Sequence, residues 1–126
     1  MVNEATKRIL MVIPHNAFRE ALAMHLDQEE DLEVAWQADS LADTGEVHLD
    51  GIDVALVDPL LPDGDGLALV REVSVSNPKA SSVVLCSDHD QALYDRAVGA
   101  GAVEVLATNS GLEEVVNVVR RSTRDQ

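Results

Sequence analysis

The chain of 126 residues has the length of one ordinary domain, and its 46% hydrophobic and 25% charged residues fit a folded globular protein. Nine Lys and Arg against 23 Asp and Glu give a formal net charge of −14 at pH 7, which repels nucleic acid because phosphate binding depends on cationic side chains. No apolar run approaches a membrane span, and a single cysteine excludes an internal disulfide. We expect one cytoplasmic domain over residues 1–126, with its core at about 7–121 and no contact with nucleic acid or membrane.

Five short segments have the composition of β-strands. Three are nearly uninterrupted apolar runs, at residues 9–13, 52–57 and 83–86, which predicts strands covered on both faces. Two others, residues 32–37 and 103–107, alternate large apolar residues with other residues. This alternation predicts strands at the two edges of a sheet.

Segments with helical periodicity separate these strands. The first begins at Asn16, a predicted N-cap, and carries apolar residues at steps of four. A short or frayed helix is predicted for residues 40–50, because Gly45 interrupts it. The next helix opens at Gly66 and must end before Pro78.

Two further helices complete the pattern. Asp90 is the predicted cap of a helix that ends at Gly99, with Leu93, Ala97 and Val98 facing inward. Residues 110–113, Ser-Gly-Leu-Glu, fit a capping box whose cap residue contributes about 1 kcal/mol. The apolar stripe of this last helix consists of Leu112, Val115, Val116 and Val119.

The elements alternate β and α five times, which predicts a parallel sheet with helices on both faces. With the alternating strands at the edges, the fold class is α/β, a flavodoxin-like (βα)5 three-layer sandwich with sheet order 2-1-3-4-5. Ligand chemistry in such folds lies beyond the carboxyl ends of strands one and three. These ends are at Pro14-His15 and at Asp58.

Asp58 is the leading candidate for a functional residue. It ends a buried apolar run and precedes a loop rich in turn residues, so its carboxylate is both held in place and accessible. The alternative interpretation is that Asp58 only terminates the strand and caps the loop.

Residues 53–66, Asp-Val-Ala-Leu-Val-Asp-Pro-Leu-Leu-Pro-Asp-Gly-Asp-Gly, place a proline four residues and a glycine eight residues after Asp58. With residues 12–22 and 97–102, this motif resembles the receiver domain of bacterial two-component response regulators, particularly those fused to a helix-turn-helix output domain. The resemblance covers about residues 7–121. It implies phosphotransfer from a histidine kinase to Asp58, with a shifted helix face as the output.

The sequence departs from the family at the residues that bind the metal ion. Family members carry two acidic residues after strand one that hold Mg²⁺, whereas this chain has Ile13 and Pro14, followed by His15. Because Mg²⁺ prefers oxygen ligands, only Asp58 and the Leu60 carbonyl remain of the expected set. We therefore expect Mg²⁺ to bind weakly or not at all.

Three further positions of the family's switch are also altered. The hydroxyl residue after strand four aligns with Cys86, with Ser87 next to it, the lysine after strand five aligns with Thr108, and the switch aromatic aligns with Val105. A phosphorylated Asp58 would add roughly −1.5 to −2 charges, by analogy with phosphoserine, to a domain already at −14. No recognisable group neutralises this charge.

Two lone side chains near this site have alternative interpretations. In the functional interpretation, His15 pairs with Asp58 or binds a softer metal. In the alternative interpretation, it is a capping residue at the rim of the site. Cys86 is either a redox sensor or an inert buried hydrophobe, which is the usual state of such a cysteine.

The sequence thus predicts an atypical receiver domain that acts in signal transduction by protein contact, is not an enzyme and needs no cofactor. The alternatives are a conventional receiver that is phosphorylated at Asp58 and a small-ligand sensor that uses the crevice between strands one and three. Expected protein partners are a histidine kinase or an output domain, and a second copy of the chain. The predicted homodimer face lies on the fourth helix, strand five and the last helix, with candidate residues Tyr94, Asp95, Arg96, Glu114, Val118 and Arg120.

Overall fold

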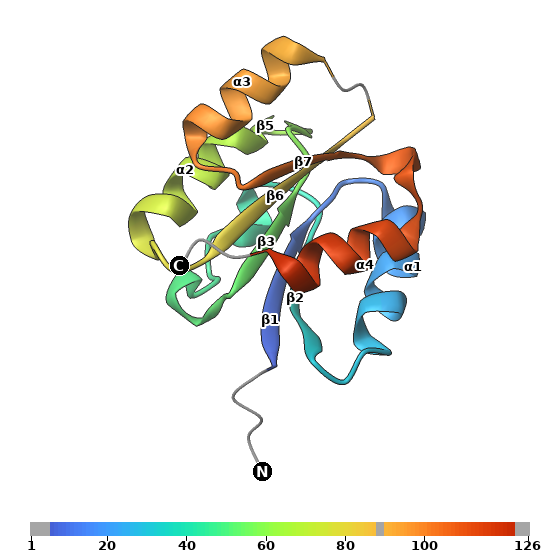
Figure 1. Ribbon diagram of the computed structural model, residues 1–126. Coiled ribbons are helices and arrows are strands. Elements are labelled where there is room, and N and C mark those ends of the chain that lie inside the picture. Colours follow the sequence, from blue (N-terminus) through green and yellow to red (C-terminus); the bar gives the residue numbers. More distant parts are fainter. Residues whose placement is uncertain (1–5, 88–89, 123–126) are drawn as a thin grey trace.

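The computed structural model describes residues 6–87 and 90–122, which form one parallel five-stranded sheet in the order β2-β1-β3-β6-β7 (Figure 1). This arrangement confirms the predicted flavodoxin-like α/β fold and places the two alternating segments at the sheet edges. The strands are β1 Lys7–Val12, β2 Leu32–Ala38, β3 Val54–Val57, β6 Ser81–Cys86 and β7 Glu104–Ala107.

Four helices cover the sheet in two pairs (Figure 1). Helices α1 and α4 lie on one face, and α2 and α3 lie on the other. A small hairpin of β4 Leu60–Leu61 and β5 Gly64–Asp65 connects β3 to α2. No helix in the described part of the chain is long and apolar enough to cross a membrane. The helices are α1 Asn16–Asp27, α2 Gly66–Ser76, α3 Gln91–Ala100 and α4 Leu112–Arg121.

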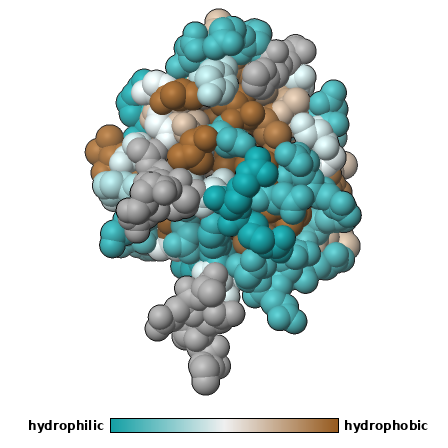
Figure 2. All heavy atoms as spheres, in the orientation of Figure 1, coloured by the Kyte–Doolittle hydropathy of each residue, from teal (hydrophilic) through white to brown (hydrophobic). Residues whose placement is uncertain are grey.

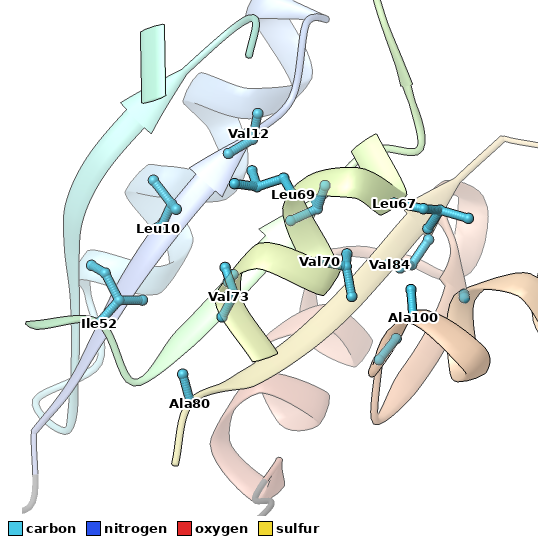
Figure 3. Close-up of a cluster of buried hydrophobic side chains, with 14 of the residues drawn as sticks. Leu10, Val12, Ile52, Leu67, Leu69, Val70, Val73, Ala80, Val84 and Ala100 are labelled. Atoms are coloured by element: carbon cyan, nitrogen blue, oxygen red, sulfur yellow. The ribbon is translucent and has the colours of Figure 1, made fainter. Parts of the chain in front are cut away.

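An apolar cluster packs on each face of the sheet. Leu10 and Val12 point into the cluster under α2 and α3 (Figure 3), whereas Ile9 and Met11 point into the cluster under α1 and α4. Alternate residues of one strand are therefore buried on opposite faces. This explains why the central strands appear in the sequence as uninterrupted apolar runs.

The edge strand β2 contains an irregularity that the sequence pattern did not predict. Its register with β1 pairs Ile9 with Val34 but Leu10 with Trp36, so the pairing skips Ala35. Such a bulge reverses the alternation from that point on. Trp36 consequently lies beside Leu10, with 41% of its surface exposed.

The helix predicted for residues 40–50 is not formed. Two 3₁₀ turns, Ala42–Thr44 and Leu49–Gly51, replace it. The first turn is held by the Asp63 carboxylate, whose two oxygens accept the N–H groups of Leu41 and Ala42 at 2.9 Å each. This short segment covers the sheet with side chains that are only half-buried.

Three predicted helix ends were wrong. The side chain of His15, not Asn16, caps α1, because its Nδ1 accepts the Phe18 N–H at 3.2 Å. Helix α3 runs past Gly99 to Ala100, and its C-cap is Gly101, which has the left-handed φ of 118°. Helix α4 begins after Gly111 without any side-chain cap, so the predicted capping box is absent.

Two valines also differ from the predicted helix faces. Val98 was expected to face inward but is 45% exposed, and Val118 was expected at the surface but is only 1% exposed. Two other predictions for the helices are confirmed. Asp90 caps α3 by accepting the Leu93 N–H at 2.7 Å, and α2 ends before Pro78.

Candidate functional site

Asp58 follows directly after β3 at the carboxyl edge of the sheet. Its N–H donates to the Val12 carbonyl at 3.0 Å, which anchors the backbone to β1. Its Oδ1 accepts the Leu60 N–H at 2.8 Å. Burial raises the pKa of the half-buried Asp58 carboxyl, and this hydrogen bond offsets only part of the rise. The carboxylate is therefore positioned by its own loop and is partly desolvated.

The loop after Asp58 is closed by Gly66. The Gly66 N–H donates to the Pro59 carbonyl at 2.9 Å, and a Cβ added at Gly66 would lie 2.1 Å from the Asp58 carbonyl oxygen. Asp65 then caps α2, because its Oδ1 accepts the Leu67 N–H at 2.9 Å. The Asp-Gly pairs of this loop thus have turn and capping roles.

A cavity of about 460 Å³ opens beside Asp58, between the β4–β5 hairpin and α3. An ion pair joins its two walls, since Arg96 Nη2 on α3 lies 3.1 Å from Asp65 Oδ2. Four predicted site residues contribute to the lining: Asp58, Leu60, Cys86 and Ser87. The full lining is Asp58, Pro59, Leu60, Gly64, Asp65, Cys86, Ser87, Asp90, Ala92, Leu93 and Arg96.

The residues predicted after β1 do not line this cavity. Ile13 is 2% exposed and belongs to the apolar cluster under α1 and α4. His15 is exposed and uses Nδ1 as a helix cap. Arg19 folds back from α1, and its Nη1 donates to the Ile13 carbonyl at 2.7 Å. A guanidinium therefore lies near the position where receiver domains carry acidic residues.

The remaining predicted positions lie on or near β7. Val105 is half-buried and packs with the cluster under α2 and α3, and Thr108 begins a 3₁₀ turn after the strand. Neither residue lines the cavity. Cys86 is 3% exposed, and its Sγ lies 3.9 Å from the Leu106 carbonyl oxygen. This burial favours the interpretation of Cys86 as a packing residue.

Comparison with known proteins places this geometry in a family. The chain matches the response regulator receiver domain over residues 9–120. It belongs to that family. It is 30% identical to the response regulator GacA of Pseudomonas aeruginosa over 115 residues, covering 90% of this chain and 54% of GacA. It is 29% identical to the transcriptional activator DevR/DosR of Mycobacterium tuberculosis over 108 residues, covering 84% of this chain and 50% of that protein. The chain thus spans about half the length of these curated relatives.

Solved structures agree with this assignment. The receiver domain of the response regulator NarL from Mycobacterium tuberculosis superimposes with a TM-score of 0.80 at 27% identity, over 90% of this chain and 93% of that one. A CheY-like receiver from Methanospirillum hungatei has the same fold, with a TM-score of 0.80 at 20% identity over 91% of each chain. As a receiver domain, the chain functions in two-component signalling.

The described residues do not fit the Mg²⁺ ion of the family. No group of three His, Cys, Asp or Glu side chains within residues 6–87 and 90–122 is arranged to hold a metal. Ile13 and Pro14 supply no oxygen from their side chains, whereas a hard divalent cation needs several such ligands.

Sequence reasoning missed the part of the site that α3 contributes. Arg96, which was predicted as an interface residue, also lines the cavity and pairs with Asp65, 31 residues earlier in the chain. Asp90 was predicted only as a helix cap, but it also lines the cavity. A pair between a loop residue and a residue of a distant helix leaves no local sequence pattern from which it could be predicted.

Proposed function

We propose that this receiver domain signals by protein contact, without Mg²⁺-dependent phosphorylation of Asp58. The observation that carries the proposal is the end of β1, where Ile13 is buried in the core and Arg19 binds its carbonyl. In place of two carboxylates, the site therefore has an apolar side chain and a guanidinium nearby. On this proposal the domain is a cytoplasmic signalling module and not an enzyme.

Charge supports the same conclusion. A phosphoryl group on Asp58 would add about −1.5 to −2 charges, by analogy with phosphoserine. Among the described residues that line the cavity beside Asp58, one side chain is cationic, that of Arg96, and it already pairs with Asp65. Thr108 offers a hydroxyl where the family has a lysine. A phosphorylated state is therefore much less stabilised here than in a conventional receiver.

Acetyl phosphate with Mg²⁺ provides the direct test. We expect no phosphorylated species by intact mass, no response to beryllofluoride, and unchanged partner binding in Asp58→Asn, which preserves the shape of the side chain. The variant Pro14→Asp restores one of the family's metal-binding carboxylates. Position 14 is preferable to position 13, because Pro14 is less buried than Ile13 and a carboxylate there loses less hydration. It should improve Mg²⁺ affinity in calorimetry.

Phosphorylation of the unmodified chain, or loss of partner binding in a folded Asp58→Asn protein, would favour the conventional receiver instead. Sub-millimolar Mg²⁺ affinity of the unmodified chain would have the same meaning.

The structure changes the composition of the predicted interaction face. Val118 is buried and therefore cannot contribute to a contact. Arg120 stays at the surface, where it already pairs with Glu29 and Asp31 of the same chain. Asp95 accepts a hydrogen bond from Gln91 at 2.9 Å, and Glu114 is half-buried.

For the contact surface we propose the edge strand β7 together with the outer side of α3. Tyr94 and Val98, four residues apart on α3, are 41% and 45% exposed. The side chains of β7 are only half-buried. Figure 2 presents apolar surface over β7, between α3 and α4, on an otherwise largely hydrophilic face. An apolar centre with a polar rim suits a symmetric contact between two copies of the chain.

Sedimentation at tens of micromolar tests this surface. We expect a dimer that Val98→Asp dissociates, because a charge at the apolar centre loses its hydration on association. Val75→Asp is the control, since Val75 is 76% exposed on α2, away from this surface. A monomeric unmodified chain, or a dimer that survives Val98→Asp and Tyr94→Ala, would exclude the surface.

A further inference from the structure

The cavity beside Asp58 has an imbalance of charge. Its lining includes the carboxylates of Asp58, Asp65 and Asp90 and one guanidinium, that of Arg96. Asp65 and Arg96 neutralise each other at 3.1 Å. Asp90 caps α3, where the positive end of the helix offsets part of its charge. In the described part of the chain no cationic side chain forms an ion pair with Asp58.

Among the residues that the structure describes, no ion pair therefore balances the charge of the half-buried Asp58 carboxylate. One oxygen, Oδ1, accepts the Leu60 N–H at 2.8 Å, and the half-buried side chain lines the cavity. A cation placed against this carboxylate would form an ion pair with charge-assisted hydrogen bonds. The net charge of −14 on the chain further raises the local concentration of cations.

The rest of the lining determines which cation fits. Pro59, Leu60 and Leu93 give the cavity an apolar side, and Leu60 is 77% exposed and available for a ligand to cover. The volume of about 460 Å³ lies within the ordinary range for small-molecule sites. A bare metal ion finds no set of three ligating side chains among the residues that the structure describes. An anion would meet three carboxylates and one guanidinium among the described lining residues.

We propose that this cavity binds a small organic cation, a guanidinium or primary ammonium on a short aliphatic chain. The charged group pairs with Asp58, and the chain lies against Leu60 and Leu93. The inference rests on the proposed function in one respect, that Asp58 carries no phosphoryl group. It gives the domain an input signal in place of phosphate, and the ligand contacts α3, which also carries Tyr94 and Val98.

Titration with n-butylguanidinium, followed by two-dimensional amide NMR of the full chain, tests this proposal. We expect saturable binding at millimolar concentration, with the largest shifts at Leu60, Ser87, Ala92 and Leu93. The neutral n-butylurea has nearly the same shape and should bind about tenfold more weakly or less, because it lacks the charge-assisted hydrogen bond.

Two substitutions with equal loss of charge locate the site. Asp58→Asn should weaken n-butylguanidinium binding about tenfold or more, whereas Asp50→Asn, on an exposed turn outside the cavity, should leave it nearly unchanged. Leu60→Ser tests the apolar wall at a position too exposed to affect folding, and should weaken binding by a smaller factor.

Absence of saturable binding at tens of millimolar, equal binding of n-butylurea, or equal weakening by Asp58→Asn and Asp50→Asn would overturn the proposal. Failure of the proposed function is distinguishable, because it appears as phosphorylation by acetyl phosphate in the absence of any guanidinium compound.

Discussion

Replacement of Gly66 by alanine should destabilise the domain by roughly 3 kcal/mol, as expected for severe overpacking against the backbone. The added Cβ would lie 2.1 Å from the Asp58 carbonyl oxygen and 3.0 Å from the Pro59 Cα. These neighbours are main-chain atoms, and the Asp58 N–H is itself bonded to β1, so the loop has little freedom to retreat. Gly66 is therefore required for close approach and not for a left-handed φ.

Urea unfolding measures this effect, and Gly99→Ala provides the control. Gly99 lies within α3, and a Cβ there meets no atom within 4 Å. Alanine at this position should stabilise the domain by about 0.5–1 kcal/mol, because glycine is a poor helix former. If the free energies of unfolding of Gly66→Ala and the unmodified chain differ by less than about 1 kcal/mol, the interpretation of Gly66 is wrong. The loop would then have relaxed enough to accept the added Cβ.

The fold was predictable because its determinants are local and repeated. Burial on both faces makes the central residues of β1, β3 and β6 apolar. The sequences of β2 and β7 alternate instead, which predicted the two edges and with them the order of the sheet. The errors have non-local causes. The bulge at Ala35 depends on pairing with β1, and the choice between Gly99 and Gly101 as the end of α3 depends on where that helix packs.

The sequence predicted only those parts of the candidate site that depend on residues close together in the chain. Asp58 was identified because it ends a buried strand, and the altered positions after β1 were identified by resemblance. The cavity itself depends on residues of α3 and of the β4–β5 hairpin that are distant in sequence, such as Arg96 and Asp65, lying next to each other. The cap formed by His15 was one of two interpretations, and only the placement of Nδ1 against the Phe18 N–H distinguishes them.

The second large effect on stability is expected at Lys7, the first residue of β1. Lys7 lies at the amino-terminal end of the parallel strands, whereas Asp58 lies at their carboxyl-terminal end. Its Nζ donates to the carbonyl oxygens of Val119, Arg120 and Ser122 at 3.3, 2.6 and 2.8 Å. The last carbonyls of a helix have no partner within the helix and form its negative end, so a lysine is well suited to satisfy them. Burial lowers the pKa of Lys7, and this desolvation reduces the net gain from its contacts.

Lys7→Met keeps the length and apolar stem of the side chain but leaves these carbonyls unsatisfied, and should destabilise the domain by about 2 kcal/mol. Lys79→Met is the matched control, because Lys79 is exposed and should give nearly no change. The neighbouring pairs of Arg120 with Glu29 and Asp31 are about 40% exposed and screened by solvent, so Arg120→Gln should lower the stability much less than Lys7→Met. Amide hydrogen exchange should quicken at Ser122, whose N–H bonds the Val118 carbonyl at 2.9 Å, well before the centre of α4 is affected. Equal unfolding midpoints for Lys7→Met and Lys79→Met would mean that water satisfies the end of α4 as well as Lys7 does.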